Sequence, residues 1–316
     1  MILITGGAGF ICSHLVRKLL NENLDVAVID NFNSFYDPAL KRENLEHVKD
    51  RIELFETDIR DKIAIKRIFD THKFETVIHL AAMAGVRPSI EDPGLYSEVN
   101  IDGTVNLLES CRKNGIHRFI FASSSSVYGN NRKVPFNEDD GVDYPISPYA
   151  ATKKAGELLC HTYHHLFKLD VTCLRFFTVY GPSQRPEMAI HKFTRLLSEE
   201  KPLPVYGNGD SARDYTYIDD IIDGVYRAYQ KIGGYHIYNL GESQTTTLNT
   251  LVSLIGKTLK KEPRIDYLPA LPGDVERTFA DISKARIEID YSPSIKIEKG
   301  IEKFADWFQA RKSRNC

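Results

Sequence analysis

The chain has 316 residues, enough for one large α/β unit or two smaller domains around a substantial hydrophobic core. Its 41 Lys and Arg residues nearly balance its 43 Asp and Glu residues, and the formal net charge of −2 argues against a nucleic-acid coat or a membrane-surface binder. The five cysteines lie far apart without a C-x-x-C pair, and no apolar run approaches the ~18 residues of a membrane span, so we expect a cytoplasmic protein with neither nucleic acid nor membrane as a partner.

The first half of the chain alternates short apolar runs with helical patterns. Strands are expected at 2–4, 25–29, 52–57, 76–80, 118–123 and 171–176, and helices at 11–20, 61–70, 95–113 and 149–167. Apolar runs of this length are typical of strands that are buried on both faces. Their alternation with helices predicts a Rossmann-type, doubly wound parallel sheet.

The alternation weakens in the second half of the chain, where prolines and glycines interrupt it. Short strands are expected at 237–240 and 264–267, and helices at 247–260 and 298–311. No Gly/Ser-rich linker separates the two halves. We therefore expect a nucleotide-binding domain over residues 1–178 and a smaller, mixed substrate-binding lobe over 179–316, with some of that lobe's chain crossing back to the sheet.

A glycine-rich turn follows the first strand and opens the first helix. Gly6 and Gly9 stand where backbone N–H groups can approach a pyrophosphate at a helix N-terminus. Asp30 ends the second strand about 20 residues later, where a carboxylate accepts hydrogen bonds from ribose hydroxyls and repels a 2′-phosphate. No Arg or Lys follows at 31–34, so the pattern favours NAD over NADP; the alternative is an ordinary tight turn. Cys12 replaces the third glycine of the pattern, which normally allows close packing of helix on strand.

A second group of residues follows the strand at 118–123. The candidate catalytic residues are Ser124, Ser125, Ser126, Tyr149 and Lys153. The tyrosine and the lysine are spaced to share one helix face, and a nearby ammonium should lower the pKa of the phenol. Such a tyrosine could remove a proton from a sugar hydroxyl while hydride leaves the same carbon, with a serine orienting the substrate oxygen. The alternative is an ordinary amphipathic helix surface.

Together these motifs resemble those of extended short-chain dehydrogenases/reductases of the NAD-dependent sugar-nucleotide epimerase/dehydratase group, over nearly the whole chain. Further matching segments are Asp58-Ile59, Leu80-Ala81-Ala82, Asn100 and Arg213-Asp214-Tyr215. The resemblance implies NAD contacts from Gly6, Gly9, Phe10, Ile11, Asp30, Asn31, Asn33, Asp58, Ile59, Leu80, Ala81, Ala82, Asn100, Ser123, Tyr149 and Lys153. It implies Tyr149 as the general base, Ser124 as its partner, and Ser125 or Ser126 near the sugar. It also implies a homodimer built on helices like those at 95–113 and 149–167.

The residues after the serine-rich strand distinguish between the reactions of this group. The 4,6-dehydratases place an Asp-Glu pair there and UDP-glucuronate decarboxylases a Glu, whereas this chain has Ser125, Ser126 and Val127. Without an acid for a second step, 4-epimerisation of a UDP-sugar is favoured. A UDP-glucose or UDP-N-acetylglucosamine 4-epimerase and a UDP-glucuronate decarboxylase stay open as alternatives. A catalytically silent NAD-sensing protein is a further alternative, against which the intact Tyr149 and Lys153 argue.

Segments 81–89 and 181–189 resemble UDP-glucuronate 4-epimerases, which favours UDP-glucuronate as the substrate and UDP-galacturonate as the product. Arg185 could pair with a substrate carboxylate in a bidentate fork, with Thr178 as a second holder. A phosphate contact or a surface position are the alternatives for this arginine. The resemblance implies Arg213 at the diphosphate, unless a neighbouring aspartate pairs with it, and Asp274 at the uridine ribose. The remaining candidate substrate contacts are Arg87, Ser89 and Arg277.

Three histidines stand at metal-ligand spacing on the helix expected at 149–167. They are His161, His164 and His165. No carboxylate ligand for such a site can be identified elsewhere in the sequence. We therefore expect a helix-surface or dimer-face role for them, and no bound metal.

Overall fold

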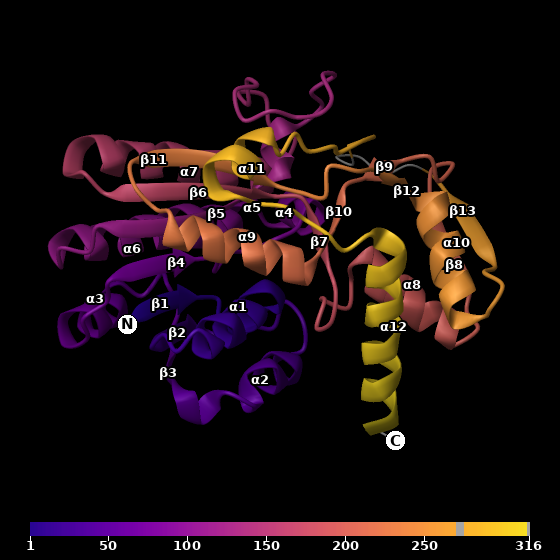
Figure 1. Cartoon of the computed structure of the whole chain (residues 1–316), viewed down its shortest axis with the longest axis horizontal. Helices are drawn as coiled ribbons and strands as arrows, with labels where there is room; N and C mark the ends of the chain where they lie inside the picture. The colour runs from indigo at the N-terminus through magenta and orange to yellow at the C-terminus, as the bar shows by residue number, and fades with distance from the viewer. Residues whose placement is uncertain (270–274, 315–316) are drawn as a thin grey trace.

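The computed structural model describes residues 1–269 and 275–314 and is built around one parallel sheet (Figure 1). Its strands are β1 (Ile2–Thr5), β2 (Val26–Asp30), β3 (Ile52–Glu56), β4 (Thr76–His79), β5 (Arg118–Ser124), β6 (Asp170–Phe176) and β11 (Tyr235–Leu240). They lie in the order β11-β6-β5-β4-β1-β2-β3, and each neighbouring pair is parallel. The direction of winding reverses between β1 and β4, which places a ligand crevice at the carboxyl ends of these two strands. The predicted Rossmann-type sheet is confirmed.

Helices cover both faces of the sheet. The α-helices of the described residues are α1 (Phe10–Asn21), α2 (Pro38–Glu46), α3 (Lys62–Thr71), α4 (Val86–Glu91), α5 (Pro93–Ser97), α6 (Gly103–Lys113), α7 (Pro148–Phe167), α8 (Ala189–Ser198), α9 (Ile218–Gln230), α10 (Leu248–Leu259), α11 (Ser283–Ile289) and α12 (Ile297–Arg314). Side chains alternate along β1, so successive residues enter different cores. Ile4 joins Leu15 of α1 and Ile221 of α9 in one cluster. Leu3 joins Leu107 of α6 in the other.

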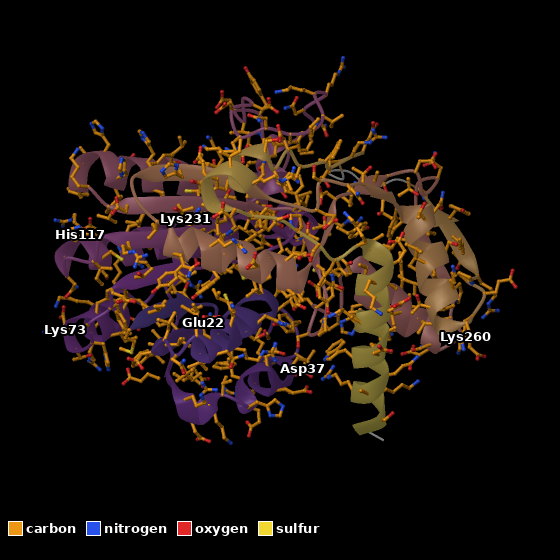
Figure 2. All side chains as sticks on the ribbon, in the orientation of Figure 1. Glu22, Asp37, Lys73, His117, Lys231 and Lys260 are labelled. Carbon is orange, nitrogen blue, oxygen red and sulfur yellow. The ribbon has the colours of Figure 1, made fainter. Side chains whose placement is uncertain are left out.

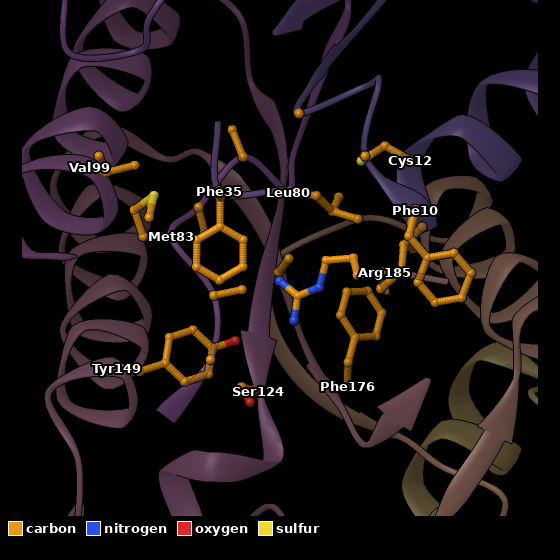
Figure 3. Close-up of a pocket in the computed structure, with 18 of the residues that line it drawn as sticks. Phe10, Cys12, Phe35, Leu80, Met83, Val99, Ser124, Tyr149, Phe176 and Arg185 are labelled. Atoms are coloured by element: carbon orange, nitrogen blue, oxygen red, sulfur yellow. The ribbon is translucent and has the colours of Figure 1, made fainter. Parts of the chain in front are cut away.

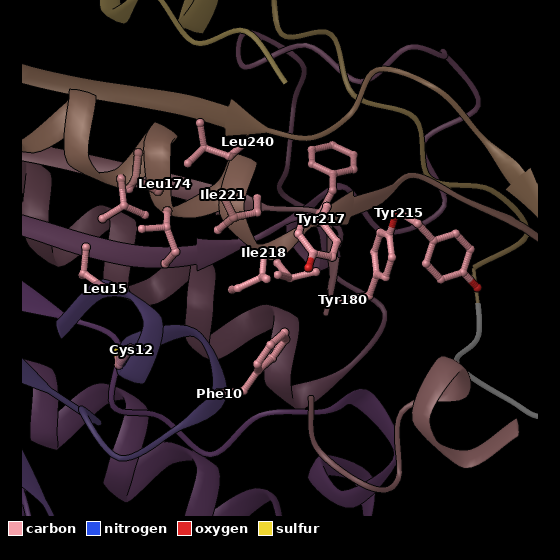
Figure 4. Close-up of a cluster of buried hydrophobic side chains, with 14 of the residues drawn as sticks. Phe10, Cys12, Leu15, Leu174, Tyr180, Tyr215, Tyr217, Ile218, Ile221 and Leu240 are labelled. Carbon is pink, nitrogen blue, oxygen red and sulfur yellow. The ribbon is translucent and has the colours of Figure 1, made fainter. Parts of the chain in front are cut away.

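The remaining strands form short pairs beside the main sheet. They are β10 (Tyr215–Tyr217) with β7 (Thr178–Tyr180), β12 (Thr246–Thr247) with β9 (Ala212–Arg213), and β13 (Ile265–Leu268) with β8 (Leu203–Tyr206). Figure 1 shows β8, β13, α8, α10 and α12 gathered on one side of the sheet. The hydrophobic core continues from α1 into this region through Phe10, Tyr180 and Tyr217 (Figure 4). The two halves of the chain therefore share one core.

Several elements differ from the sequence prediction. The helix expected at 95–113 consists of α5, a π-helical segment at Glu98–Asp102, and α6. Helix α2 was not predicted, although Asp37 caps its N-terminus by accepting a hydrogen bond from the backbone of Ala39, with Pro38 in its first turn. Strand β11 lies at the edge of the main sheet, so the chain does cross back to it. The division after residue 178 stays a prediction.

Charged side chains lie around the outside of the molecule. The exposed residues labelled in Figure 2 are Glu22, Asp37, Lys73, His117, Lys231 and Lys260. Within residues 1–269 and 275–314, no helix combines the length and apolarity needed to cross a bilayer. The same part of the chain holds no group of three or more His, Cys, Asp and Glu side chains placed to bind a metal ion. On α7, His161 stacks on His165, and His164 contacts the carbonyl oxygen of Leu169.

Candidate active site

A cavity of about 380 Å³ opens at the carboxyl ends of β1, β2, β4, β5 and β6 (Figure 3). The candidate cofactor residues in its wall are Gly6, Gly9, Phe10, Ile11, Asp30, Asn31, Asn33, Asp58, Ile59, Leu80, Ala81, Ala82, Ser123, Tyr149 and Lys153. The candidate catalytic and substrate residues in its wall are Ser124, Ser125, Ser126, Thr178 and Arg185. Parallel strands end at the same edge of a sheet, and this edge gathers residues that are far apart in the sequence.

The glycine turn packs too closely on neighbouring backbone to admit a larger residue. Gly6 has a φ of +73°, and a Cβ at this position would lie 2.9 Å from the Cα of Ala81. A Cβ on Gly9 would lie 3.1 Å from the carbonyl oxygen of Gly6. The turn leads directly into α1, whose first N–H groups have no carbonyl partner within the helix. Close backbone approach and a helix N-terminus together fit the pyrophosphate of a dinucleotide.

Cys12 fills the third glycine position without separating α1 from β1. Its side chain is buried, and its thiol donates to the carbonyl oxygen of Thr5, which lies 3.6 Å from Sγ. Burial and the charge of Asp30 raise the pKa of Cys12 well above its ordinary value. The thiol therefore stays neutral and acts as a small packing group.

Two carboxylates stand at the cofactor end of the cavity. Asp30 Oδ2 accepts from the backbone N of Ala8 at 3.0 Å, and Oδ1 accepts from the backbone N of Phe32 at 2.8 Å. Burial raises the pKa of Asp30, while these hydrogen bonds oppose the rise. Asp58 Oδ2 accepts from Asn31 Nδ2 at 2.9 Å. The two side chains are thus fixed where ribose hydroxyls of a dinucleotide would meet hydrogen-bond acceptors.

The segment after β2 supplies wall residues that sequence reasoning missed. They are Phe35, Tyr36 and Lys41. Helix α2 brings Lys41 back to the cavity, where its Nζ donates to the carbonyl and side-chain oxygens of Asn33 at 2.8 and 2.9 Å. Residues 31–34, which favour NAD over NADP because they include no Arg or Lys, do not extend to this lysine. The Asp37-Pro38 helix start was the available signal.

Helix α7 presents Tyr149 and Lys153 to the end of β5. Ser147 caps this helix by accepting from the backbone N of Ala150 at 3.1 Å, and proline follows in the first turn. The hydroxyl of Tyr149 points toward Ser124 and Arg185 (Figure 3). Lys153 is buried, and its Nζ donates to the carbonyl oxygen of Ala122 at 2.7 Å. Burial lowers the pKa of Lys153 to about 8.

The expectation that Tyr149 has a lowered pKa is wrong for this structure. Burial raises its pKa, and the hydrogen bond with Ser124 and the charge of Arg185 oppose the rise. Lys153 Nζ lies 6.0 Å from the centroid of the tyrosine ring and hydrogen-bonds a backbone carbonyl. Loss of surrounding water therefore outweighs the effect that was inferred from spacing along the helix.

Two candidate cofactor residues support the cavity through other contacts. Asn100 lies in the π-helical segment and does not line the cavity; its Oδ1 accepts from the backbone N of Met83 at 2.8 Å. Its Nδ2 donates to the carbonyl oxygen of Met83 and to Thr152 Oγ1, each at 3.0 Å. Asn100 therefore ties the loop after β4 to α7, and its direct contact with the cofactor stays a prediction. The Ser123 hydroxyl donates to Glu157 Oε1 at 2.6 Å, and the residue also lines the cavity.

Arg185 reaches the cavity from the loop between β7 and α8. Gln184 anchors this loop: its Nε2 donates to the carbonyl oxygen of Val179, and its Oε1 accepts from the backbone N of His191, each at 3.2 Å. Figure 3 shows Arg185 between Phe35 and Phe176, with its guanidinium directed toward the catalytic tyrosine. A fixed cation therefore faces the candidate general base.

A second cavity of about 130 Å³ adjoins the first. Val86, Ser125, Ser126 and Thr178 line both cavities. Arg213 lines only the second, together with hydroxyl-bearing side chains. A guanidinium among hydroxyl groups suits an anionic diphosphate. The predicted substrate residues Thr178, Arg185 and Arg213 thus lie along one connected space.

Other predicted substrate residues lie elsewhere. Arg87 and Ser89 line neither cavity: the arginine stacks on a tyrosine ring, and the serine hydroxyl donates to a carbonyl of its own helix. Arg277 also lines neither cavity and forms a β-bridge with β9. Asp274 lies outside the described residues. The resemblance of segment 81–89 to known enzymes thus did not predict which of its side chains face the cavity.

Comparisons with known proteins agree with this geometry. A family model described as GDP-mannose 4,6 dehydratase matches residues 3–304. A UDP-glucuronate 4-epimerase of Thermodesulfobacterium geofontis is 43% identical over 308 residues, which cover 96% of this chain and 95% of the relative. The structure of UDP-glucuronic acid 4-epimerase from Bacillus cereus, in complex with UDP-glucuronic acid and NAD, has a TM-score of 0.92 at 37% identity and covers 98% of this chain and 99% of that chain.

A third similar protein acts on a neutral sugar. The structure of UDP-glucose 4-epimerase from Thermotoga maritima, solved with UDP-glucose, has a TM-score of 0.92 at 34% identity and covers 98% of this chain and 99% of that chain. The similarity therefore extends over both sheet and lobe in all of these proteins. This chain belongs to the GDP-mannose 4,6-dehydratase family, within the extended short-chain dehydrogenases/reductases.

Proposed function

We propose that this protein is an NAD-dependent UDP-sugar 4-epimerase that interconverts UDP-glucuronate and UDP-galacturonate. The observation that carries the proposal is the placement of Arg185 in the same cavity as Tyr149, with its guanidinium toward that tyrosine (Figure 3). The glycine turn and Asp30 fit NAD, as found in the Bacillus cereus relative. On this proposal residues 1–178 hold the cofactor, and residues 179–316 hold most of the UDP-sugar.

The chain's own residues account for the proton transfers of an epimerisation. Tyr149 takes the proton of the C4 hydroxyl as the general base and later returns it, while Ser124 donates a hydrogen bond to the same oxygen. Lys153 holds its end of α7 against β5 through the Ala122 carbonyl. NAD, held by the glycine turn and Asp30, would supply reversible hydride transfer at C4, so no net oxidation would result.

The acidic residues of the cavity argue against dehydration. Among the described residues that line the two cavities, the carboxylates are Asp30 and Asp58, and both lie at the cofactor end. Ser125 and Ser126 line both cavities, in the part where we expect the sugar to bind. Elimination of water needs an acidic group near the sugar in addition to Tyr149, and the described wall supplies no carboxyl group there. The keto sugar is therefore expected to be reduced again.

A held carboxylate would also oppose decarboxylation. Oxidation of glucuronate at C4 gives a β-keto acid, which loses CO₂ when the breaking bond aligns with the carbonyl π system. Arg185 can grip both carboxylate oxygens, with Thr178 nearby in the same wall. Fixing the carboxylate out of that alignment favours epimerisation over loss of CO₂. A neutral UDP-hexose is the second candidate substrate, supported by the Thermotoga maritima relative.

Replacing Arg185 by methionine should separate acid from neutral sugars. Loss of a charge-assisted bidentate contact should lower kcat/KM for UDP-glucuronate about 10- to 100-fold, with a smaller change for UDP-glucose. Products from each UDP-sugar would be followed by NMR with the holoenzyme. Arg195→Met is the matched control, because the side chain of Arg195 on α8 is 42% exposed and pairs with Glu199 at the surface. Turnover of UDP-glucose without any UDP-galacturonate from UDP-glucuronate would contradict the acid-sugar proposal.

We also propose a homodimer through the outer face of α7. Leu158 and Leu166 are 56% and 59% exposed there. Light scattering should give the mass of a dimer for the wild type and of a monomer for the double variant Leu158→Glu, Leu166→Glu. Ile63→Glu on α3, which changes an equally apolar residue that is 75% exposed, should leave the dimer intact. A wild-type monomer, or a dimeric double variant, would refute this interface.

A cytoplasmic location also belongs to the proposal. The cysteines of the described residues, which are Cys12, Cys111, Cys160 and Cys173, are free and buried thiols. A reducing compartment keeps thiols in this state.

A further inference from the structure

The guanidinium of Arg185 contacts two side chains, Phe35 in the cavity wall and Glu187 in its own loop. Its Nε lies 3.0 Å from Glu187 Oε1 in an ion pair. Its Cζ lies 5.3 Å from the centroid of the Phe35 ring, within the range of a cation–π contact. Figure 3 shows Phe35 and Arg185 meeting inside the cavity. The side chain of Arg185 is 19% exposed and that of Glu187 is 46% exposed, so the ring contact is the more shielded from water of the two.

These contacts leave one edge of the guanidinium for a ligand. Glu187 takes the Nε edge, and Phe35 takes a face of the planar group. The two terminal nitrogens form the edge that grips a carboxylate with two parallel hydrogen bonds. A hydroxymethyl group on a neutral sugar cannot make that paired contact. Holding the guanidinium in this orientation therefore benefits an acid sugar more than a neutral one.

Phe35 is itself fixed by the cofactor end of the cavity. Its backbone N donates to Asn33 Oδ1 at 3.1 Å, and Lys41 Nζ donates to the same oxygen at 2.9 Å. The next residue, Tyr36, has a buried hydroxyl with no hydrogen-bond partner in the described part of the chain. Burial and the charge of Asp30 raise the pKa of Tyr36, whereas the charge of Arg185 lowers it. Segment 31–37 thus reaches from Asp30 to Arg185.

We propose that Phe35 and Glu187 are specificity-determining positioning residues, which hold Arg185 with its terminal nitrogens toward the sugar so that a carboxylate is preferred over a hydroxymethyl group. The inference rests on the proposed function. A free arginine side chain loses rotamer entropy when it is fixed. Phe35 and Glu187 fix the Arg185 side chain before the substrate binds. Binding then causes a smaller loss of entropy, and the affinity is higher. Segment 31–37 also carries Asn33, a candidate NAD contact. The segment that contacts the cofactor therefore also positions Arg185, which selects the sugar.

Two substitutions test this arrangement in the holoenzyme. Phe35→Leu keeps an apolar side chain without a ring face, and Glu187→Ala removes the partner of Nε. Each should lower the ratio of kcat/KM for UDP-glucuronate to that for UDP-glucose about three- to tenfold, mainly through KM. NAD content per chain should stay at the wild-type value. Glu187→Gln keeps the size of the side chain without its charge, and should lower the ratio less than Glu187→Ala does.

The controls separate this inference from the proposed function. Glu199→Ala removes a surface partner of Arg195 on α8 and should leave the ratio unchanged. If UDP-glucose binds without turnover, the ratio of kcat/KM values is replaced by the ratio of the two dissociation constants, measured by calorimetry. An unchanged or increased ratio in both Phe35→Leu and Glu187→Ala, with a collapsed ratio in Arg185→Met, would overturn the positioning role and leave the proposed function standing. An unchanged ratio in Arg185→Met would instead overturn the acid-sugar function.

Discussion

Replacing Tyr149 by phenylalanine should reduce epimerase turnover on the order of 10²- to 10⁴-fold, because the variant lacks the hydroxyl that exchanges the C4 proton. The ring and its packing remain, so the fold and the NAD content should not change. Product formation followed by NMR measures the loss, and cofactor released on denaturation measures the NAD content. Tyr144→Phe is the matched control, since Tyr144 is 89% exposed. Full activity in Tyr149→Phe would show that another group moves the proton.

The pH dependence of the reaction offers a second readout for the same tyrosine. A general base acts when it is deprotonated, so kcat/KM should rise with pH up to the pKa of Tyr149. Burial raises that pKa, and Ser124 and Arg185 oppose the rise. Ser124→Ala and Arg185→Met should therefore each move the rising limb of the profile to higher pH. A limb that stays in place in both variants would mean that a different group titrates.

The cofactor half of the protein was largely predictable from its sequence. Apolar runs alternating with helical patterns predict strands that are buried on both faces, and the observed sheet has that construction. All strands of a parallel sheet run in the same direction, so their carboxyl ends lie at one edge of the sheet. Gly6, Asp30 and Tyr149 therefore meet in the cavity, as their positions after the strands predicted.

Features that depend on side-chain direction and burial were not predictable in this way. The spacing of Tyr149 and Lys153 is correct, yet desolvation of the tyrosine reverses the expected shift of its pKa. Asn100 sits in a π-helical turn that points it at the Met83 backbone instead of the cavity. Lys41 and Phe35 enter the wall because α2 folds back over the end of β2, and no local periodicity encodes that return.

Replacing Arg175 by methionine should lower the free energy of unfolding by about 3–5 kcal/mol, because the buried carboxylate of Glu157 then keeps, among the described residues, only the more distant Lys154 as a cation, 3.6 Å from its Oε2. Arg175 and Glu157 are each 1% exposed. Arg175 Nε and Nη2 donate to the two oxygens of Glu157 at 2.8 and 2.9 Å, and Nη1 donates to the Tyr128 hydroxyl at 2.9 Å. Although burial alone would raise the pKa of Glu157, the arginine holds it below its ordinary value. The pair joins α7 to β6.

Glu157 of the same pair also contacts β5, the strand that ends at Ser124. Removing the pair therefore also tests how much the candidate active site depends on it. Glu157 accepts from Ser123, the residue before Ser124. Urea unfolding at saturating NAD would measure the loss in Arg175→Met. The double variant Glu157→Gln, Arg175→Met should recover part of it, because no unpaired charge then remains buried. Arg195→Ala, which breaks an exposed pair, should cost no more than about 1 kcal/mol. A loss that small in Arg175→Met would mean that water reaches Glu157, contrary to its burial between α7, β5 and β6.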